Sequence, residues 1–181
     1  RDQVDRAVAA GATYIVSPGL NRDIVRYCQE KGVVIVPGCA NPSDVEVALE
    51  EGLKTVKFFP AEALGGLPLI KAMAAPYGAV TFLPTGGITE KNLNDYLAFP
   101  KIVACGGSWM VPADAVANKD WARIESLTRT AVNTMLGLEL RHIGINSGDP
   151  ETAAKDAAMI AKLLGWPLDD HQDAVFVNKA S

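Results

Sequence analysis

Long hydrophobic runs, low-complexity tracts and a strong excess of either charge are all missing from this sequence of 181 residues. No apolar stretch approaches the roughly 20 residues that a membrane-spanning helix needs, so no membrane partner is predicted. The formal net charge of -4 provides neither a basic surface for nucleic acid nor an attraction to anionic lipid. These values predict one ordinary soluble domain with an appendage, and neither nucleic acid nor membrane as a partner.

Cysteine and histidine are scarce as well. The three cysteines, Cys28, Cys39 and Cys105, are odd in number, scattered and without C-x-x-C spacing. This pattern argues against a disulfide framework or a cysteine zinc site and predicts reduced thiols in a cytoplasmic protein. Of the two histidines, His171 lies in a polar segment that is predicted to be a solvated loop.

The two ends of the chain interrupt the pattern of secondary structure. The sequence opens with Arg1 rather than Met, inside a helical pattern, and stops at Ser181 without a helix cap or polar tail. We therefore expect a piece of a longer protein.

Apolar, β-rich runs alternate with helix-period segments from the start to about residue 110. The runs are 13–19, 33–38, 55–62, 80–87 and 102–108, and the helical segments between them include 21–32, 41–52 and 88–99. Asn21, Asn41 and Thr89 are predicted at or near N-caps, and Gly32 and Gly52 are predicted C-terminal caps. Continuous apolar runs predict strands buried on both faces, hence parallel βαβ units and an α/β fold. The pattern alone leaves open whether the sheet is doubly wound or a closed (β/α)8 barrel.

A long amphipathic helix is predicted around 119–136, and the repeated pattern of strands and helices ends there. The remainder reads as strand, helix at about 150–164 and a second strand near 173–178. We therefore predict a domain of residues 1–136 and a partial α+β extension of residues 137–181, which is too short to bury a sizeable core alone.

Lys57 places a charge in the middle of a run, "TVKFFPAE", that otherwise reads as a buried strand. Side chains alternate along a strand, so Thr55, Lys57 and Phe59 share one face, and Val56 with Phe58 would meet the helices. Desolvation pushes an amine toward its neutral, nucleophilic form, which Schiff-base chemistry requires. The structural alternative is a lysine that is paired with Glu62 or that reaches solvent at the rim.

Two glycine pairs follow consecutive predicted strands, in "PTGG" (84–87) and "CGGS" (105–108), and each is expected to lead into a helix. Glycines let backbone N–H groups approach an anion, and a helix N-terminus adds a favourable dipole. The loops are therefore predicted to bind phosphate or another anion; the alternative is two tight turns that merely require glycine.

The motifs "SPGL" (17–20), "VPG" (36–38), "KFFPAE" (57–62), "PTGGI" (84–88) and "GGSWMVPADA" (106–115) carry a resemblance. In this order and spacing, residues 1–136 resemble the class I aldolases that act on 2-keto-3-deoxy-6-phosphogluconate and, in many members, on 4-hydroxy-2-oxoglutarate. The resemblance implies a (β/α)8 barrel, of which about five of eight strands are present here, and a homotrimer for the full-length protein. It also implies reversible cleavage to pyruvate and glyceraldehyde 3-phosphate, or to pyruvate and glyoxylate, without a cofactor.

By matching position, the resemblance assigns Lys57 as the Schiff-base lysine, with Phe59 packed beside it. It places Thr85, Gly86 and Gly87 around the pyruvyl carboxylate and the phosphate. The remaining substrate-binding positions that it implies are Pro18, Pro37, Gly106, Gly107 and Ser108. The acid/base glutamate of the family lies on an early strand that has no match in this chain.

The segment "LRHIGINSGDPETAA" (140–154) resembles the opening of a glyoxalase-like, vicinal oxygen chelate module. In that family the strand histidine, here His142, is often a metal ligand, but the other ligands come from later strands. No metal site is therefore predicted in this chain.

The alternative to the aldolase is a non-catalytic or differently catalytic phosphate-binding barrel fragment.

Overall fold

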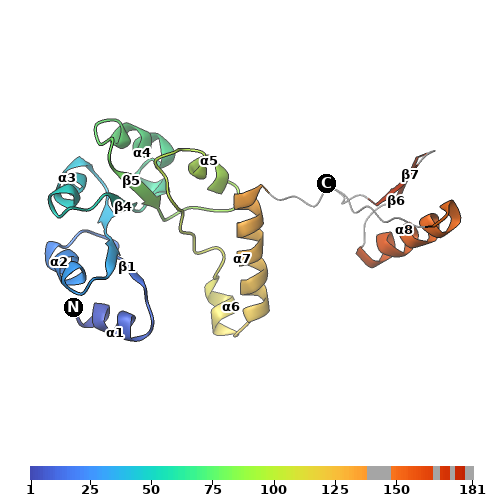
Figure 1. Cartoon of the computed structure of the whole chain (residues 1–181), viewed down its shortest axis with the longest axis horizontal. Helices are drawn as coiled ribbons and strands as arrows, with labels where there is room; N and C mark the ends of the chain where they lie inside the picture. Colours follow the sequence, from blue (N-terminus) through green and yellow to red (C-terminus); the bar gives the residue numbers. More distant parts are fainter. Residues whose placement is uncertain (138–147, 165–167, 172–173, 178–181) are drawn as a thin grey trace. The chain divides into compact units, whose positions relative to one another are not determined.

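The computed structural model describes residues 1–137, 148–164, 168–171 and 174–177 (Figure 1). The chain divides into two compact units, Arg1–Leu136 and Gly137–Ser181. No helix among the described residues is long and apolar enough to cross a membrane.

Short parallel strands form the centre of the first unit. β1 (Tyr14–Val16) pairs with β2 (Val34–Val36), and β3 (Gly38–Cys39), β4 (Thr55–Phe58) and β5 (Thr81–Pro84) pair in that order. Only Pro37 separates β2 from β3, and its carbonyl accepts the Lys57 N–H at 2.9 Å. The run 33–38 therefore changes its pairing partner at Pro37: the part before the proline pairs with β1, and the part after it pairs with β4.

The prediction of parallel strands is confirmed for these runs, but the run at 102–108 does not form a strand. It contributes only isolated parallel bridges, between Phe82 and Ile102 and between Thr85 and Gly106. The two glycines after Cys105, Gly106 and Gly107, favour a loop conformation over a regular ladder.

Helices alternate with the strands along the chain. They are α1 (Asp2–Ala9), α2 (Arg22–Glu30), α3 (Pro42–Glu50), the 3-10 helix η1 (Glu62–Leu64), α4 (Gly66–Ala74), α5 (Leu93–Leu97), α6 (Ala113–Ala117) and α7 (Trp121–Leu136).

The predicted caps of α2 and α3 are confirmed. The side chains of Asn21 and Asn41 accept backbone N–H groups in the first turns, and Gly32 and Gly52 follow the last turns with positive φ. At α5 the prediction is wrong, because the N-cap is Asn92. Its Oδ1 accepts the backbone N–H of Thr89 at 2.7 Å, which makes Thr89 the donor in a turn before the helix.

The core lies between the strands and the helices on one face of the sheet. Val56 and Phe58 are fully buried there with helix residues such as Val45 and Ile70. The other face is open: Tyr14 is 58% exposed and Val34 is 62% exposed. The expectation of strands buried on both faces is therefore wrong for the described structure, since helices cover a single face.

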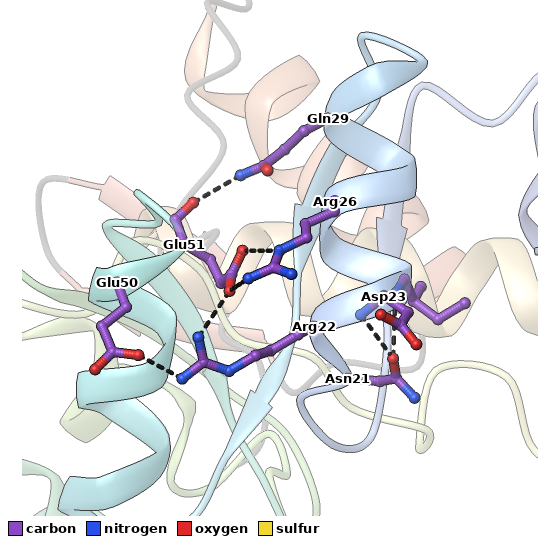
Figure 2. A network of polar contacts seen from close by, with 8 residues as sticks. Asn21, Arg22, Asp23, Arg26, Gln29, Glu50 and Glu51 are labelled. Carbon is purple, nitrogen blue, oxygen red and sulfur yellow. Dashed lines mark hydrogen bonds and ion pairs between the residues drawn. The ribbon is translucent and has the colours of Figure 1, made fainter.

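Charged side chains join α2 to the end of α3 (Figure 2). Arg22 and Arg26 both bind the carboxylate of Glu51 at 2.8–2.9 Å, and Arg22 also binds Glu50. The Nε2 of Gln29 donates to the carbonyl of Glu51 at 2.7 Å. Arg26 and Arg22 hold the pKa of Glu51 below its ordinary value, so this network fixes the spacing of two helices that follow neighbouring strands.

In the second unit, α8 (Pro150–Leu164) precedes the antiparallel strands β6 (Leu168–His171) and β7 (Ala174–Val177). The predicted helix and the predicted last strand are confirmed. His171 belongs to β6 and not to a loop, because its residues pair with β7. The predicted strand with His142 lies outside the described residues.

Candidate active site

Lys57 lies in β4 between two neighbours that support its backbone. In register, it is paired with Gly38 of β3 on one side and with Leu83 of β5 on the other. Val56 and Phe58 are buried on the helix-covered face, as predicted, so alternation directs the Lys57 side chain to the open face. This face carries the site.

The ammonium group of Lys57 lies 4.4 Å from the centre of the Phe59 ring. Among the described residues, no carboxylate lies within ion-pair distance of it. Partial burial lowers the pKa of Lys57 from its ordinary value. The lysine therefore has the surroundings that favour a neutral amine, namely desolvation without a compensating negative charge.

The alternative in which Lys57 pairs with Glu62 is not what the structure contains. The carboxylate of Glu62 accepts a hydrogen bond from the phenol of Tyr96, a residue of α5 that is 2% exposed. Burial first, and then Glu62, raise the pKa of Tyr96. The sequence predicted Glu62 only as a possible partner of Lys57 and gave no role to Tyr96, because the positions of Glu62 and Tyr96 in the chain do not suggest a contact.

The two glycine loops lie side by side. Thr85 and Gly106 form a parallel bridge, and the Gly106 N–H donates to the Pro84 carbonyl at 3.0 Å. A Cβ on Gly106 would lie 2.7 Å from the Thr85 methyl group, and one on Gly107 would lie 2.7 Å from the Trp109 ring. Glycine is therefore needed here for close packing.

The first glycine loop also contacts the segment that follows Lys57. The N–H groups of Ala61 and Glu62 donate to the carbonyls of Thr85 and Gly86 at 2.8 and 3.0 Å. A Cβ on Gly86 would lie 3.3 Å from the Phe59 ring. One aromatic ring therefore contacts both the lysine and the glycine loop.

Two backbone amides of this loop are available to a ligand. The Gly86 carbonyl accepts from Glu62, and the Gly87 carbonyl accepts from the side-chain amide of Asn92 at 3.1 Å. In a trans peptide the N–H points opposite to the carbonyl, so the N–H groups of Gly87 and Ile88 point away from these partners. In the part of the chain that the structure describes, neither N–H has a protein acceptor. Such successive free amides are the donors that anion sites use.

In the described structure no helix begins directly after either glycine pair, although helix N-termini were expected there to favour an anion. α5 begins at Leu93 and α6 at Ala113, so turns separate both helices from the glycine pairs. Each helix spans only 5 residues. The expectation of a helix dipole behind each loop is wrong, and any anion affinity comes from the loop amides themselves.

The hydroxyl oxygen of Thr85, Oγ1, is buried and has no hydrogen-bond partner among the described residues. In that part of the chain it is the one buried side-chain oxygen or nitrogen in this state. A buried hydroxyl without a partner is costly, so its position at the bridge between the loops suits a hydroxyl that binds a ligand.

The other predicted site residues differ in whether they contact the residues around Lys57. Pro37 is buried and accepts from Lys57, and the Pro18 carbonyl lies against Gly38, where a Cβ would be 2.0 Å from it. Ser108 is exposed, and its carbonyl accepts from Val111 in a turn. His142 lies outside the described residues, and the described residues hold no group of three or more metal-ligating side chains.

Sequence comparison matches residues 1–127 to the family described as KDPG and KHG aldolase. A relative from Treponema pallidum, named 2-dehydro-3-deoxy-phosphogluconate aldolase, is 50% identical over 128 residues, which cover 71% of this chain and 61% of the relative. The aldolase of Zymomonas mobilis ZM4, solved with 3-phosphoglycerate, is 43% identical at a TM-score of 0.67, covering 72% of this chain and 61% of that one.

The aldolase of Legionella pneumophila was captured with pyruvate as a covalent carbinolamine. It is 38% identical, with a TM-score of 0.66, and the match covers 75% of this chain and 63% of that one. The chain thus spans about three fifths of the length of these relatives, as their coverage of 61% and 63% shows.

Proposed function

Because the chain belongs to the KDPG and KHG aldolase family, we propose that the protein is a class I aldolase that cleaves 2-keto-3-deoxy-6-phosphogluconate. The products are pyruvate and glyceraldehyde 3-phosphate, and 4-hydroxy-2-oxoglutarate is a second substrate that yields pyruvate and glyoxylate. The observation that carries the proposal is Lys57, which is partly buried, has a lowered pKa and lies against the Phe59 ring, itself next to the first glycine loop.

Lys57 is the proposed nucleophile. Its neutral amine adds to the keto carbon of the substrate, and loss of water gives a protonated imine. Cleavage of the bond between C3 and C4 sends its electron pair into this iminium and leaves an enamine, while the C4 hydroxyl loses its proton and becomes the aldehyde. Protonation of the enamine at C3 and hydrolysis release pyruvate and restore the amine.

The loop residues are proposed to hold the two anionic groups of the substrate. The N–H groups of Gly87 and Ile88 are free to donate to an oxyanion, with Gly106, Gly107 and Ser108 in the neighbouring loop. The Thr85 hydroxyl, which has no partner, is proposed to bind the pyruvyl carboxylate. Phe59 shields the lysine, and Pro18 and Pro37 shape the backbone beside it.

The proposed architecture is a (β/α)8 barrel that assembles as a homotrimer in the cytoplasm and needs no cofactor. The strand order supports a barrel, because the described runs 14–16, 34–39, 55–58 and 81–84 pair in sequence order, without the reversal of order that a doubly wound sheet has. Helices on one face only also favour a barrel, whose other face is the interior.

Trapping with pyruvate and sodium borohydride, read by mass spectrometry on the full-length protein, tests the function. We expect one pyruvate adduct on Lys57, no adduct in Lys57→Ala, and an unchanged adduct in the control Lys54→Ala, since Lys54 is exposed before the same strand. An adduct on another lysine contradicts the assignment. In a phosphate-binding barrel of another activity, where Lys57 serves only as a charge, Lys57→Arg retains activity; in the aldolase it abolishes cleavage.

For Gly137–Ser181 the proposal is the beginning of a glyoxalase-like module, supported by the resemblance of residues 140–154. The order of α8, β6 and β7 fits an α+β unit. Equilibrium dialysis with Zn2+, comparing the full-length protein with His142→Ala, tests whether the histidine is a metal ligand there. Equal binding by both contradicts that role.

A further inference from the structure

Glu62 and Tyr96 form a pair directly beneath the first glycine loop. Tyr96 reaches Glu62 from α5, and the Glu62 side chain runs under Gly87. A Cβ on Gly87 would lie 2.5 Å from both Cβ and Cγ of Glu62. The methylene groups of Glu62 therefore occupy the space that any larger residue at Gly87 would need.

The carboxylate end of the pair is confined as well. A Cβ on Gly66, the first residue of α4, would lie 2.9 Å from Glu62 Oε1 and 2.9 Å from the Tyr96 hydroxyl. The backbone of Glu62 is tied to the loop by its N–H, which donates to the Gly86 carbonyl. Three contacts thus fix Glu62: its N–H bonds to the Gly86 carbonyl, its methylene groups pack against Gly87, and its carboxylate accepts from Tyr96.

This arrangement fixes the side chain that packs against the Gly86–Gly87 turn. The Gly87 N–H points away from Glu62, because the Gly86 carbonyl of the same peptide accepts from the Glu62 N–H. Tyr96 holds the far end of the Glu62 side chain, because its buried hydroxyl donates to the carboxylate.

We propose that Tyr96 and Glu62 are positioning residues for the phosphate arm of the substrate. Glu62 packs against the Gly86–Gly87 turn, and Tyr96 holds the Glu62 side chain in the position that keeps the N–H groups of Gly87 and Ile88 directed toward an anion. This inference rests on the proposed function, which supplies a phosphorylated substrate for that loop.

The test uses Tyr96→Phe, which removes only the hydroxyl, in the full-length protein. We expect the KM for 2-keto-3-deoxy-6-phosphogluconate and the inhibition constant of inorganic phosphate to rise together by about tenfold, the scale of one hydrogen bond to a charged group. Cleavage of the non-phosphorylated 2-keto-3-deoxygluconate and trapping of pyruvate on Lys57 should stay within about twofold, since neither uses the loop amides.

The double variant Tyr96→Phe/Glu62→Ala separates positioning from general damage. Because Tyr96 acts on the turn through Glu62, adding Tyr96→Phe to Glu62→Ala should cause no further loss of phosphate affinity. Glu62→Gln keeps the stem and an oxygen that can accept from Tyr96, so it should lose less affinity than Glu62→Ala. Tyr77→Phe is the matched control, because Tyr77 likewise donates to a glutamate, Glu46 of α3, at 3.0 Å.

Equal losses on the phosphorylated and non-phosphorylated substrates, or losses from Tyr96→Phe and Glu62→Ala that add in the double variant, overturn the proposal. Should Tyr96→Phe fail to fold, Glu62→Ala decides, because loss of the stem should raise the phosphate inhibition constant, and an unchanged value overturns the inference. Absence of pyruvate trapping in the unmodified protein refutes the proposed function instead, so the two failures are distinguishable.

Discussion

Replacing Gly38 by alanine should destabilise the protein at the point where β3 contacts the loop after β1. A Cβ on Gly38 would lie 2.0 Å from the Pro18 oxygen, 2.3 Å from its carbonyl carbon and 2.8 Å from the Gly19 nitrogen. All three are backbone atoms, which cannot rotate away as a side chain does. Contact at 3.0 Å, the least that real Cβ atoms show, requires a displacement of about 1 Å.

The size of the effect follows from this overlap. Overpacking typically costs 1–3 kcal/mol, and a clash with three backbone atoms places Gly38→Ala near the upper end, at about 3 kcal/mol. For a domain of 150–250 residues this loss corresponds to a Tm that is lower by about 6–12 °C. Gly38 is paired with Lys57, so we also expect slower trapping of pyruvate.

Urea unfolding followed by circular dichroism measures the free energy of unfolding in the full-length protein. Gly19→Ala is the matched control, because it lies in the same loop and a Cβ there meets nothing within 4 Å. It should leave the free energy unchanged or raise it by less than about 1 kcal/mol. Equal stability of Gly38→Ala and Gly19→Ala would refute the argument from backbone contact.

Three further outcomes are expected. Asn41→Ala removes the side chain that caps α3 and should lower the free energy of unfolding by about 1 kcal/mol, whereas Asn133→Ala on exposed α7 should not. Burial lowers the pKa of Lys57, so the rate of pyruvate trapping should rise with pH with a midpoint below the ordinary lysine value of 10.5; a midpoint at or above that value contradicts the assignment. Burial raises the pKa of Cys39 to about 12 and that of Cys105 to about 11, so iodoacetamide at pH 8 should label both slowly until urea unfolds the protein, and equal labelling rates would contradict it.

Local signals predicted the alternation of strands and helices well. Asparagine before a helix and glycine after it act through neighbouring backbone groups, so the caps of α2 and α3 could be located from the sequence. Apolar runs predicted the strands, because a run of neighbouring apolar residues is also a local signal. The failures occur where the turn is irregular, as at Thr89, whose role depends on a hydrogen bond from Asn92 that no helix pattern specifies.

The candidate site was predictable where a single residue breaks a pattern. Lys57 was recognisable because a charge interrupts an apolar strand, and the glycine pairs because they follow consecutive runs. The pair of Glu62 and Tyr96 could not be predicted, since its residues belong to different elements and meet only through tertiary packing. The reason for glycine at position 87 was also hidden: the sequence suggested approach of an anion, whereas a Cβ would meet the Glu62 side chain.

The pairing of Glu62 with Tyr96 also has a consequence for the lysine. Lys57 and Glu62 belong to one short segment, "KFFPAE", and a salt bridge between them was the structural alternative to catalysis. A carboxylate beside Lys57 would favour the protonated amine and raise its pKa, which opposes attack on a carbonyl. In the structure Tyr96 engages that carboxylate, and the ammonium group faces the Phe59 ring instead. Burial is then left to lower the pKa of Lys57. In the structure Glu62 therefore contributes no opposing charge to Lys57, and the lowered pKa of the lysine reflects desolvation.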